Sequence, residues 1–470
     1  MDLEVNTPLA LEFHRLINKS NNTIYIHPSI KADISRDNNS TRAKLRRTLI
    51  SKYSFVESPP PLAILDSEIV GTPEDETNDW VDNHLLATLQ GSAADYLVTE
   101  DLKLHQKAKR LNLGDRVLHL NDAISILRDL FDKSPLPPPA VDEVYVYELE
   151  ERDPIFNTLR EDYNEFDNWL DKCKREHRKA YVIKDVESNN IAAICILKQE
   201  EQLLDSRNGK TLKLCTFKVS ETHGGSRYGE LLLKAVFDYI RANQYKYAYF
   251  TAYPKQDRLI AFAKDFGFYE IDSNINEYRG QVVLCKETKP TTADVANMSP
   301  LDLHIKYGPS ITSFRDNFSF FVPIEPQYHE VLFPEYEKQI SMFPGMHPCG
   351  NSIRKAYLSY SPITLIRRGD NLFFYRSRDH KSITVLGIVE DTKRSNSPDE
   401  IAKFVGKRTV YTYAEIAEMC KKNVFAIKFR QVSLLGTPIY MDRILNKNIF
   451  QAIPQSIAKI RNIEWLSQQI

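Results

Sequence analysis

The spacing of apolar and polar positions differs between the three parts of the chain, and the N-terminal part alternates helical and strand patterns. The predicted helices cover residues 8–17, 82–89 and 122–131, and the predicted strands cover residues 23–27, 96–99 and 117–120. Alternation of this kind predicts a mainly parallel sheet with helices packed against it.

The middle part contains a strand, a glycine-bearing turn and a helix in direct succession. Residues 212–217 show the alternating pattern of a strand, and residues 224–229 read GGSRYG. Apolar positions then recur at helical spacing up to Ile240. A second strand, 247–253, leads to a helix that ends at Gly267-Phe268, and residues 200–209 predict a hairpin tip. Glycines that lead into a helix N-terminus favour an anion, because backbone N–H groups and the helix dipole point at it.

The C-terminal part is rich in strand patterns. The predicted strands cover residues 363–366, 371–375, 382–389 and 424–429, and the predicted helices cover residues 397–405 and 413–420. This order predicts an α+β domain or a small barrel.

Two segments separate these parts. Residues 134–143 are proline-rich and residues 288–300 are polar without periodicity, so both are predicted linkers. A chain of 470 residues is also too long for one core. We therefore predict a multidomain α/β and α+β protein with domains at 1–133, 144–287 and 301–470.

Composition narrows the class of protein. With 62 basic and 63 acidic residues the chain has no overall attraction for nucleic acid, although a local basic face is compatible with this balance. The six cysteines form no CxxC pair, which favours reduced thiols over disulfides or zinc. No apolar run reaches transmembrane length and no signal-peptide core opens the sequence. We expect a cytoplasmic protein without a membrane partner.

Carboxylates in the first domain are candidate metal ligands. Asp33 lies on the helix after the first strand, Asp79 and Asp82 share a helix face, and Asp101 follows a strand. Converging carboxylates can hold Mg²⁺ or Mn²⁺, which activate water for attack on a phosphodiester. The alternative is a solvated acidic surface with helix caps.

The motifs TIYIHPSIKAD, DNHLLATL and YLVTED resemble, in this order, the PIN domain of metal-dependent ribonucleases. That family includes the toxins of toxin–antitoxin pairs, so an antitoxin or another protein partner is implied. The resemblance assigns the metal to Asp33, Asp82 and Asp101. The family's first strand, which ends in an aspartate, has no counterpart before Asp2, so we expect a PIN-like fold without that strand or a start further upstream.

The turn in the middle domain resembles the acyl-CoA-binding loop of GNAT N-acyltransferases. Val219 stands ten residues before Gly229, Leu231-Leu232 follow, and Gly267-Phe268 ends the second helix. The resemblance implies a mixed α/β sheet, acetyl-CoA or another acyl-CoA, and a pyrophosphate held by loop N–H groups. The implied cofactor-binding residues are Phe217, Val219, Gly224, Gly225, Ser226, Arg227, Tyr228 and Gly229. Without the resemblance, the same glycines are also compatible with an ordinary tight turn.

Three positions depart from the GNAT pattern and bear on catalysis. Gly224 replaces a basic residue, Arg227 replaces a glycine, and Ala263 stands where many members carry a tyrosine acid. We therefore predict Glu221 as the base and Tyr253 as the acid, with His223 and Tyr228 as alternatives.

Basic and aromatic residues alternate in the third domain, as in RNA-binding surfaces. They are Arg354, Lys355, Arg367, Arg368, Phe373, Phe374, Tyr375, Arg376, Arg378, His380 and Lys381. Residues 340–445 resemble PUA-like barrels of the ASCH and EVE kind, many of which bind RNA. The alternative is a hairpin with a packed aromatic face and a charged exposed face.

These patterns together predict an acyl-CoA-dependent N-acyltransferase coupled to a PIN-like nuclease module and an RNA-binding domain. The acceptor would be linked to tRNA or the translation machinery. One alternative is a metal-dependent endoribonuclease in which the GNAT unit is a sensor or scaffold. Another is an RNA-binding regulator whose catalytic units have decayed.

Overall fold

A computed structural model describes most of the chain and divides it into two compact units, residues 1–133 and 134–470. The described residues are 7–20, 22–131, 140–185, 188–203, 207–220, 223–224, 226–272, 280–309, 311–336 and 348–469. No helix within these ranges is long and apolar enough to span a membrane.

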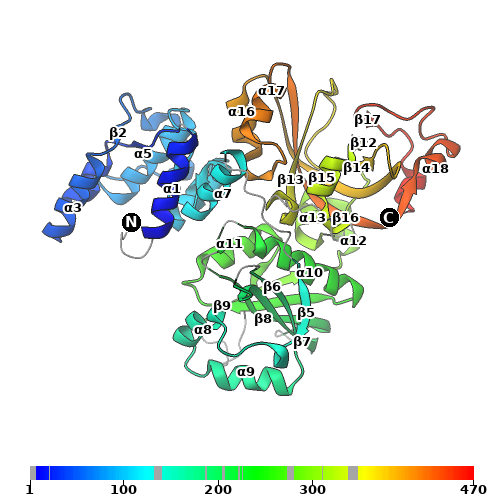
Figure 1. Cartoon of the computed structure of the whole chain (residues 1–470), viewed down its shortest axis with the longest axis horizontal. Helices are drawn as coiled ribbons and strands as arrows, with labels where there is room; N and C mark the ends of the chain where they lie inside the picture. Colours follow the sequence, from blue (N-terminus) through cyan, green and yellow to red (C-terminus); the bar gives the residue numbers. More distant parts are fainter. Residues whose placement is uncertain are drawn as a thin grey trace. The chain divides into compact units, whose positions relative to one another are not determined.

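The N-terminal unit is mainly helical (Figure 1). Its helices are α1 (Thr7–Ser20), α2 (Ile30–Ser35), α3 (Ser40–Ile50), α4 (Ser67–Val70), α5 (Asn78–Gln90), α6 (Leu102–Arg110) and α7 (Leu120–Phe131). Its strands are β1 (Tyr25–Ile26), β2 (Ser54–Phe55), β3 (Leu97–Val98) and β4 (Val117–Leu118). The parallel direction agrees with the sequence prediction, but the strands form two separate pairs, β1–β2 and β3–β4, in place of one sheet.

The first part of the second unit is built on a seven-stranded sheet in the order β10-β11-β9-β8-β7-β6-β5. The strands are β5 (Asp142–Tyr145), β6 (Lys179–Lys184), β7 (Ile191–Gln202), β8 (Asn208–Val219), β9 (Tyr247–Ala252), β10 (Tyr269–Ile271) and β11 (Val282–Glu287). Only β8 and β9 run parallel, because the crossover through a helix joins them. The predicted 200–209 hairpin joins the antiparallel pair β7–β8.

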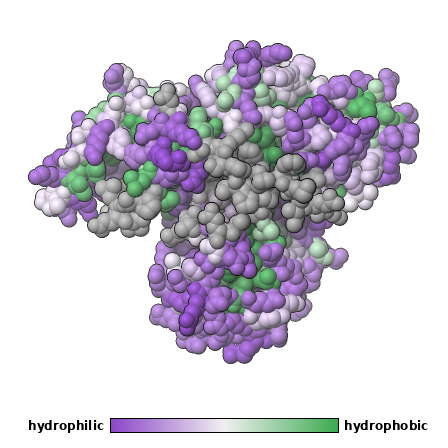
Figure 2. Space-filling view, in the orientation of Figure 1, coloured by the Kyte–Doolittle hydropathy of each residue, from purple (hydrophilic) through white to green (hydrophobic). Residues whose placement is uncertain are grey.

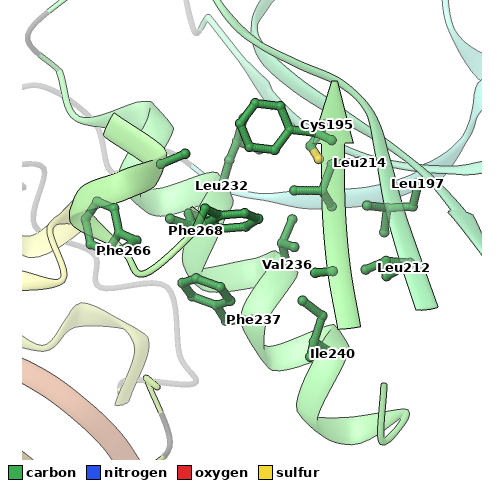
Figure 3. Packing of buried hydrophobic residues seen from close by; sticks show 14 of the residues in the cluster. Cys195, Leu197, Leu212, Leu214, Leu232, Val236, Phe237, Ile240, Phe266 and Phe268 are labelled. Carbon is green, nitrogen blue, oxygen red and sulfur yellow. The ribbon is translucent and has the colours of Figure 1, made fainter. Parts of the chain in front are cut away.

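Helices cover both faces of this sheet, as Figure 1 shows. They are α8 (Asn157–Asp162), α9 (Phe166–Arg175), α10 (Tyr228–Ala242) and α11 (Asp257–Asp265). The apolar side of α10 lies on the sheet, with Leu232, Val236 and Ile240 turned toward Leu212 and Leu214 of β8 (Figure 3). Buried residues of α9 pack on the opposite face. Apolar residues on two faces explain why β7 reads as a continuous hydrophobic run.

The C-terminal part holds a six-stranded sheet in the order β13-β16-β15-β14-β12-β17. The strands are β12 (Ser319–Ile324), β13 (Arg354–Ser359), β14 (Asn371–Arg376), β15 (Ser382–Ser395), β16 (Val424–Tyr440) and β17 (Ala458–Lys459). The helices are α12 (Thr292–Asn297), α13 (Pro300–Tyr307), α14 (Pro326–Leu332), α15 (Pro348–Asn351), α16 (Pro398–Val405), α17 (Tyr413–Met419), α18 (Met441–Asn446) and α19 (Glu464–Ser467). Within the described strands, the end strands β13 and β17 do not pair, so the predicted small barrel is not confirmed.

Two local predictions for this part were wrong. Residues 363–366 are not a strand, because Pro362 lacks an N–H and the Arg394 guanidinium binds the carbonyls of Ser361 and Ile363 at 2.9 and 2.8 Å. Residues 288–300, expected to be irregular, contain α12, whose N-terminus is capped by Thr291.

Hydrophilic residues dominate the described surface in the view of Figure 2. The large apolar side chains lie mostly in the cores.

Candidate functional site

A wedge opens between β8 and β9, the two parallel strands of the first sheet. They pair only from Thr211–Tyr247 to Lys213–Tyr249. Beyond that point β8 pairs only with β7, and β9 pairs only with β11. The carboxyl ends of the strands therefore diverge, and this end of a parallel pair is where α/β sheets bind ligands.

Apolar side chains and one glycine line the wedge. Phe217 and Val219 come from β8, Phe262 comes from α11, and Gly229 comes from the first turn of α10. A Cβ atom at Gly229 would lie 3.7 Å from both Phe262 and Val219 and 3.8 Å from Phe217. A longer side chain there would occupy the wedge. The predicted positions Phe217, Val219 and Gly229 are thus brought together.

The N-terminus of α10 points its first amides at the same end of the sheet. The N-cap residue, Arg227, has left-handed backbone angles of φ 57° and ψ 26°, and its side chain accepts no capping hydrogen bond. The first intrahelical bond runs from the Leu231 N–H to the Arg227 carbonyl at 3.1 Å. The amides of Tyr228, Gly229 and Glu230 precede it, and such amides with the helix dipole attract an anion.

The Arg227 side chain does not face this anion position. It is 8% exposed, and its Nη1 donates to Glu230 Oε1 at 3.1 Å and to the Ser352 hydroxyl. Arg227 is one of the cofactor-binding residues implied by the family resemblance, and in the structure its guanidinium donates to Glu230 and Ser352. Any anion at α10 therefore relies on backbone amides.

Other residues of the loop have defined partners. The Ser226 carbonyl accepts from Asn351 Nδ2 at 3.1 Å. His223 Nε2 lies 2.9 Å from Asp185 Oδ2, and its ring stacks on Tyr228 at 5.6 Å. The Ser188 amide, together with His223, holds the pKa of Asp185 below its usual value. Gly224 lies beside His223, whereas Glu221 and Gly225 are outside the described residues.

Tyr253, the predicted acid, directly follows β9. Its backbone N–H donates to Gln256 Oε1 at 2.9 Å, and its ring lies 5.5 Å from that of Tyr163. This places Tyr253 at the carboxyl end of the strand that borders the wedge. Ala263 is 3% exposed in the core, so no acid substitutes for the family tyrosine at that position.

The carboxylates of the N-terminal unit approach one another but do not form a metal site. Burial, followed by the charge of Asp101, raises the pKa of Asp82 to about 6, with smaller contributions from Asp79 and Asp33. Asp33 pairs with Arg36, Asp79 accepts from Lys107 at 3.0 Å, and Asp101 caps α6. No three acidic, histidine or cysteine side chains among the described residues are placed to hold a metal ion. The predicted site at Asp33, Asp82 and Asp101 is not supported.

Asp82→Asn is expected to stabilise the N-terminal unit by about 1 kcal/mol at pH 7. The folded pKa of Asp82, about 6, exceeds the ordinary 3.8, so the folded state binds more protons in that window. Its contribution to stability is therefore present at low pH and is lost as the pH rises from about 3.8 to about 6. Hydrogen exchange of α5 amides against pH measures this, with the exposed Glu57→Gln as the control. A steeper pH dependence in Asp82→Asn than in the native chain would contradict the assignment.

The prediction that aromatic residues of the third domain form part of an RNA-binding surface is wrong. Phe373 and Phe374 are 0% exposed and Tyr375 is 2% exposed, so their rings cannot stack on bases. Arg376 is buried against Glu330 and Asp379, and Arg354 is paired with Glu390. Lys355 is buried and donates to the Gly350 carbonyl. Only the cations at Arg367, Arg368, Arg378, His380 and Lys381 are exposed among those predicted.

The sequence patterns missed a polar stripe on α10. Arg227, Glu230 and Lys234 recur at helical spacing along α10, and all three contact the C-terminal part. The helical spacing of these three charged residues was the signal in the sequence that a second surface faces the helix.

Parts of the chain are similar to known proteins. Residues 144–268 match the acetyltransferase (GNAT) family, so the predicted GNAT domain is supported over that range. A GNAT family acetyltransferase from Elizabethkingia anophelis with acetyl-CoA bound is similar at 15% identity and a TM-score of 0.24, over 31% of this chain and 97% of its own. The ASCH protein from Zymomonas mobilis is similar at 12% identity and a TM-score of 0.25, over 33% and 94%. No curated protein gives a match.

Proposed function

We propose that residues 144–287 bind acetyl-CoA or a related acyl-CoA and transfer its acyl group to an amine. The observation that carries this proposal is the divergence of β8 and β9 beside the N-terminus of α10. The match of residues 144–268 to GNAT acetyltransferases supports it.

The residues around the wedge suit the two chemically different parts of acyl-CoA. The diphosphate would be held by the amides at 228–230 and by the loop that contains Gly224, Gly225 and Ser226. The uncharged arm would lie along Phe217 and Val219, with Gly229 leaving room for it. Bound acyl-CoA supplies an activated thioester; the chain binds it, orients it and moves protons.

Two proton transfers accompany amide formation. Glu221 takes a proton from the attacking amine nitrogen, or His223 does so with its ring oriented by Asp185. The Tyr253 hydroxyl gives a proton to the departing sulfur. His223 and Tyr253 follow β8 and β9 respectively, so the base and the acid come from opposite sides of the wedge.

Isothermal titration calorimetry of the full chain with acetyl-CoA tests the proposal. We expect one site per chain with a Kd of roughly 1–100 µM, the range of ordinary enzyme–substrate affinities. Adenosine alone is the control, since it lacks the diphosphate and the arm. Absence of heat with acetyl-CoA at 1:1 and higher ratios would overturn the proposal.

Tyr253→Phe is expected to lower the rate of acyl transfer by about 100-fold and to leave the acetyl-CoA affinity unchanged. The substitution removes the proton donor but keeps the ring beside Tyr163. Release of free CoA thiol during a screen of amines measures the rate, and Tyr163→Phe is the matched control. An equal loss of rate in both variants would show that Tyr253 is not the proton donor.

The proposal includes an acceptor that is linked to tRNA or the translation machinery. It also includes a separate function of the N-terminal unit, in addition to acyl transfer. Metal-dependent RNA cleavage is a second candidate, because the charges of Asp101, Asp79 and Asp33 all act on Asp82, although the described side chains do not complete a metal site. It requires Mn²⁺- or Mg²⁺-dependent cleavage of RNA that is lost in both Asp82→Ala and Asp101→Ala. Cleavage that persists in these variants would exclude it.

A further inference from the structure

The polar stripe of α10 is bound by a short segment of the C-terminal part, Asn351–Ile353, which we call the clasp. Glu230 Oε2 accepts from the Ser352 hydroxyl at 2.7 Å and from the Ile353 amide at 2.8 Å. The Ser352 hydroxyl also accepts from Arg227. Asn351 donates to the Ser226 carbonyl at 3.1 Å. The clasp therefore contacts the loop immediately before α10 and its first turn.

The clasp is buried, so its hydrogen bonds are not weakened by solvent. Ser352 is 0% exposed and Asn351 is 4% exposed. Burial opposes ionisation of Glu230, but Arg227, Ser352 and the Ile353 amide outweigh it and keep the pKa of Glu230 below its usual value. A buried carboxylate with these partners is costly to separate from them. Lys234, one turn further along α10, adds a bond to the Gly350 carbonyl at 3.4 Å and an ion pair with Glu335.

The clasp acts at Arg227, a strained residue at the end of the loop. The backbone of Arg227 has a left-handed conformation. This conformation is unfavourable for residues with a Cβ atom, whereas glycine adopts it freely. This conformation ends the loop and starts α10, so it sets the direction of the amides at 228–230. The Arg227 side chain reaches Ser352 and Glu230 from this conformation, so these bonds offset the strain.

We propose that the C-terminal clasp positions the acyl-CoA loop, by holding Arg227 left-handed so that the first turn of α10 can receive the diphosphate. The proposal rests on the acyl-CoA function argued above. It makes the C-terminal part a structural requirement for ligand binding by the middle domain. Asn351 and Ser352 are positioning residues, because they act through Ser226, Arg227 and Glu230.

Two substitutions at Arg227 separate the conformation from the side chain. Arg227→Gly and Arg227→Ala both remove the guanidinium, but only glycine adopts the left-handed conformation without strain. Calorimetry is expected to show acetyl-CoA bound about tenfold more weakly by Arg227→Ala than by Arg227→Gly. Equal affinities of the two variants would overturn the proposal.

Ser352→Ala tests the clasp from the other side. We expect about fivefold weaker acetyl-CoA binding, from the loss of one buried hydrogen-bonded group. Ser382→Ala is the matched control, because Ser382 is also 0% exposed in the C-terminal part and its hydroxyl has no hydrogen-bond partner among the residues that the structure describes. In the Arg227→Gly background, Ser352→Ala is expected to have less than half this effect. The same fold-loss in both backgrounds would show that Ser352 acts by another route.

Hydrogen exchange without ligand separates failure of this inference from failure of the proposed function. Amides at 228–232 are expected to exchange faster in Ser352→Ala than in Ser382→Ala, whether or not the chain binds acyl-CoA. No heat with acetyl-CoA in the native chain would refute the proposed function. Native binding together with unchanged exchange in Ser352→Ala would refute the clasp alone.

Discussion

Gly229→Leu is expected to abolish acetyl-CoA binding and to leave the stability of the chain nearly unchanged. A Cβ atom at Gly229 fits without a clash, but it already touches Phe262, Val219 and Phe217 at 3.7–3.8 Å. The rest of a leucine side chain therefore extends into the wedge, where the arm of acyl-CoA would lie. Leucine also has a higher helix propensity than glycine, so α10 is not weakened. We expect at least a 100-fold loss of affinity, from several lost apolar contacts.

Calorimetry and urea unfolding of the same preparation measure the two parts of this prediction. Gly436→Leu is the control, because a Cβ atom there meets nothing within 4 Å and the position lies on an exposed part of β16. Binding that survives in Gly229→Leu would place acyl-CoA outside the wedge. Unfolding of Gly229→Leu at much lower urea would instead show that the glycine is needed for packing.

Glu390→Gln is expected to lower the free energy of unfolding of the second unit by about 3–5 kcal/mol. Glu390 is 7% exposed and accepts from Arg354 Nε at 2.9 and 3.1 Å and from Arg430 Nε at 2.7 Å. Glutamine keeps the shape but removes the negative charge that the guanidinium groups of Arg354 and Arg430 face. Arg430 also donates to the Asp265 carbonyl at 3.0 Å, so the loss extends to the contact with α11.

The pH dependence of the free energy of unfolding of the native chain also reports on the ion pairs of Glu390. Burial raises the pKa of Glu390, but the charges of Arg354 and Arg430 outweigh it, so the folded pKa lies below the ordinary 4.5. The stabilisation is therefore present at neutral pH and is lost as the pH falls through the acid range. Glu418→Gln, at an exposed carboxylate, is the control. Equal urea midpoints for Glu390→Gln and Glu418→Gln would contradict the role of the buried pair.

Local patterns predicted the strand, the glycine turn and the helix beside the wedge, because these three elements are close in sequence. The alternation of residues 212–217, the glycine turn and the apolar spacing of α10 are all read within 30 residues. The pattern did not predict the orientation of Arg227, because its partner Ser352 lies 125 residues further along the chain. A basic residue in a glycine loop suggests a phosphate-binding residue. Only the fold shows that the segment around Ser352 lies next to Arg227.

The same limit explains the error at β14. A run of aromatic and basic residues fits an exposed hairpin and a central strand equally well. The structure places β14 between β12 and β15, so residues 371–376 are buried on both faces. Arg376 tolerates that position only because Glu330 and Asp379 pair with it. Pairing partners of this kind are set by the tertiary fold and have no local signature.

Hydrogen exchange of the full chain with and without acetyl-CoA tests the central claim most directly, because it locates the ligand. We predict protection of the amides at 217–219 and 226–231, at the divergent end of β8 and the first turn of α10. Protection confined to the C-terminal sheet or to the N-terminal unit, with these amides unchanged, would contradict the account.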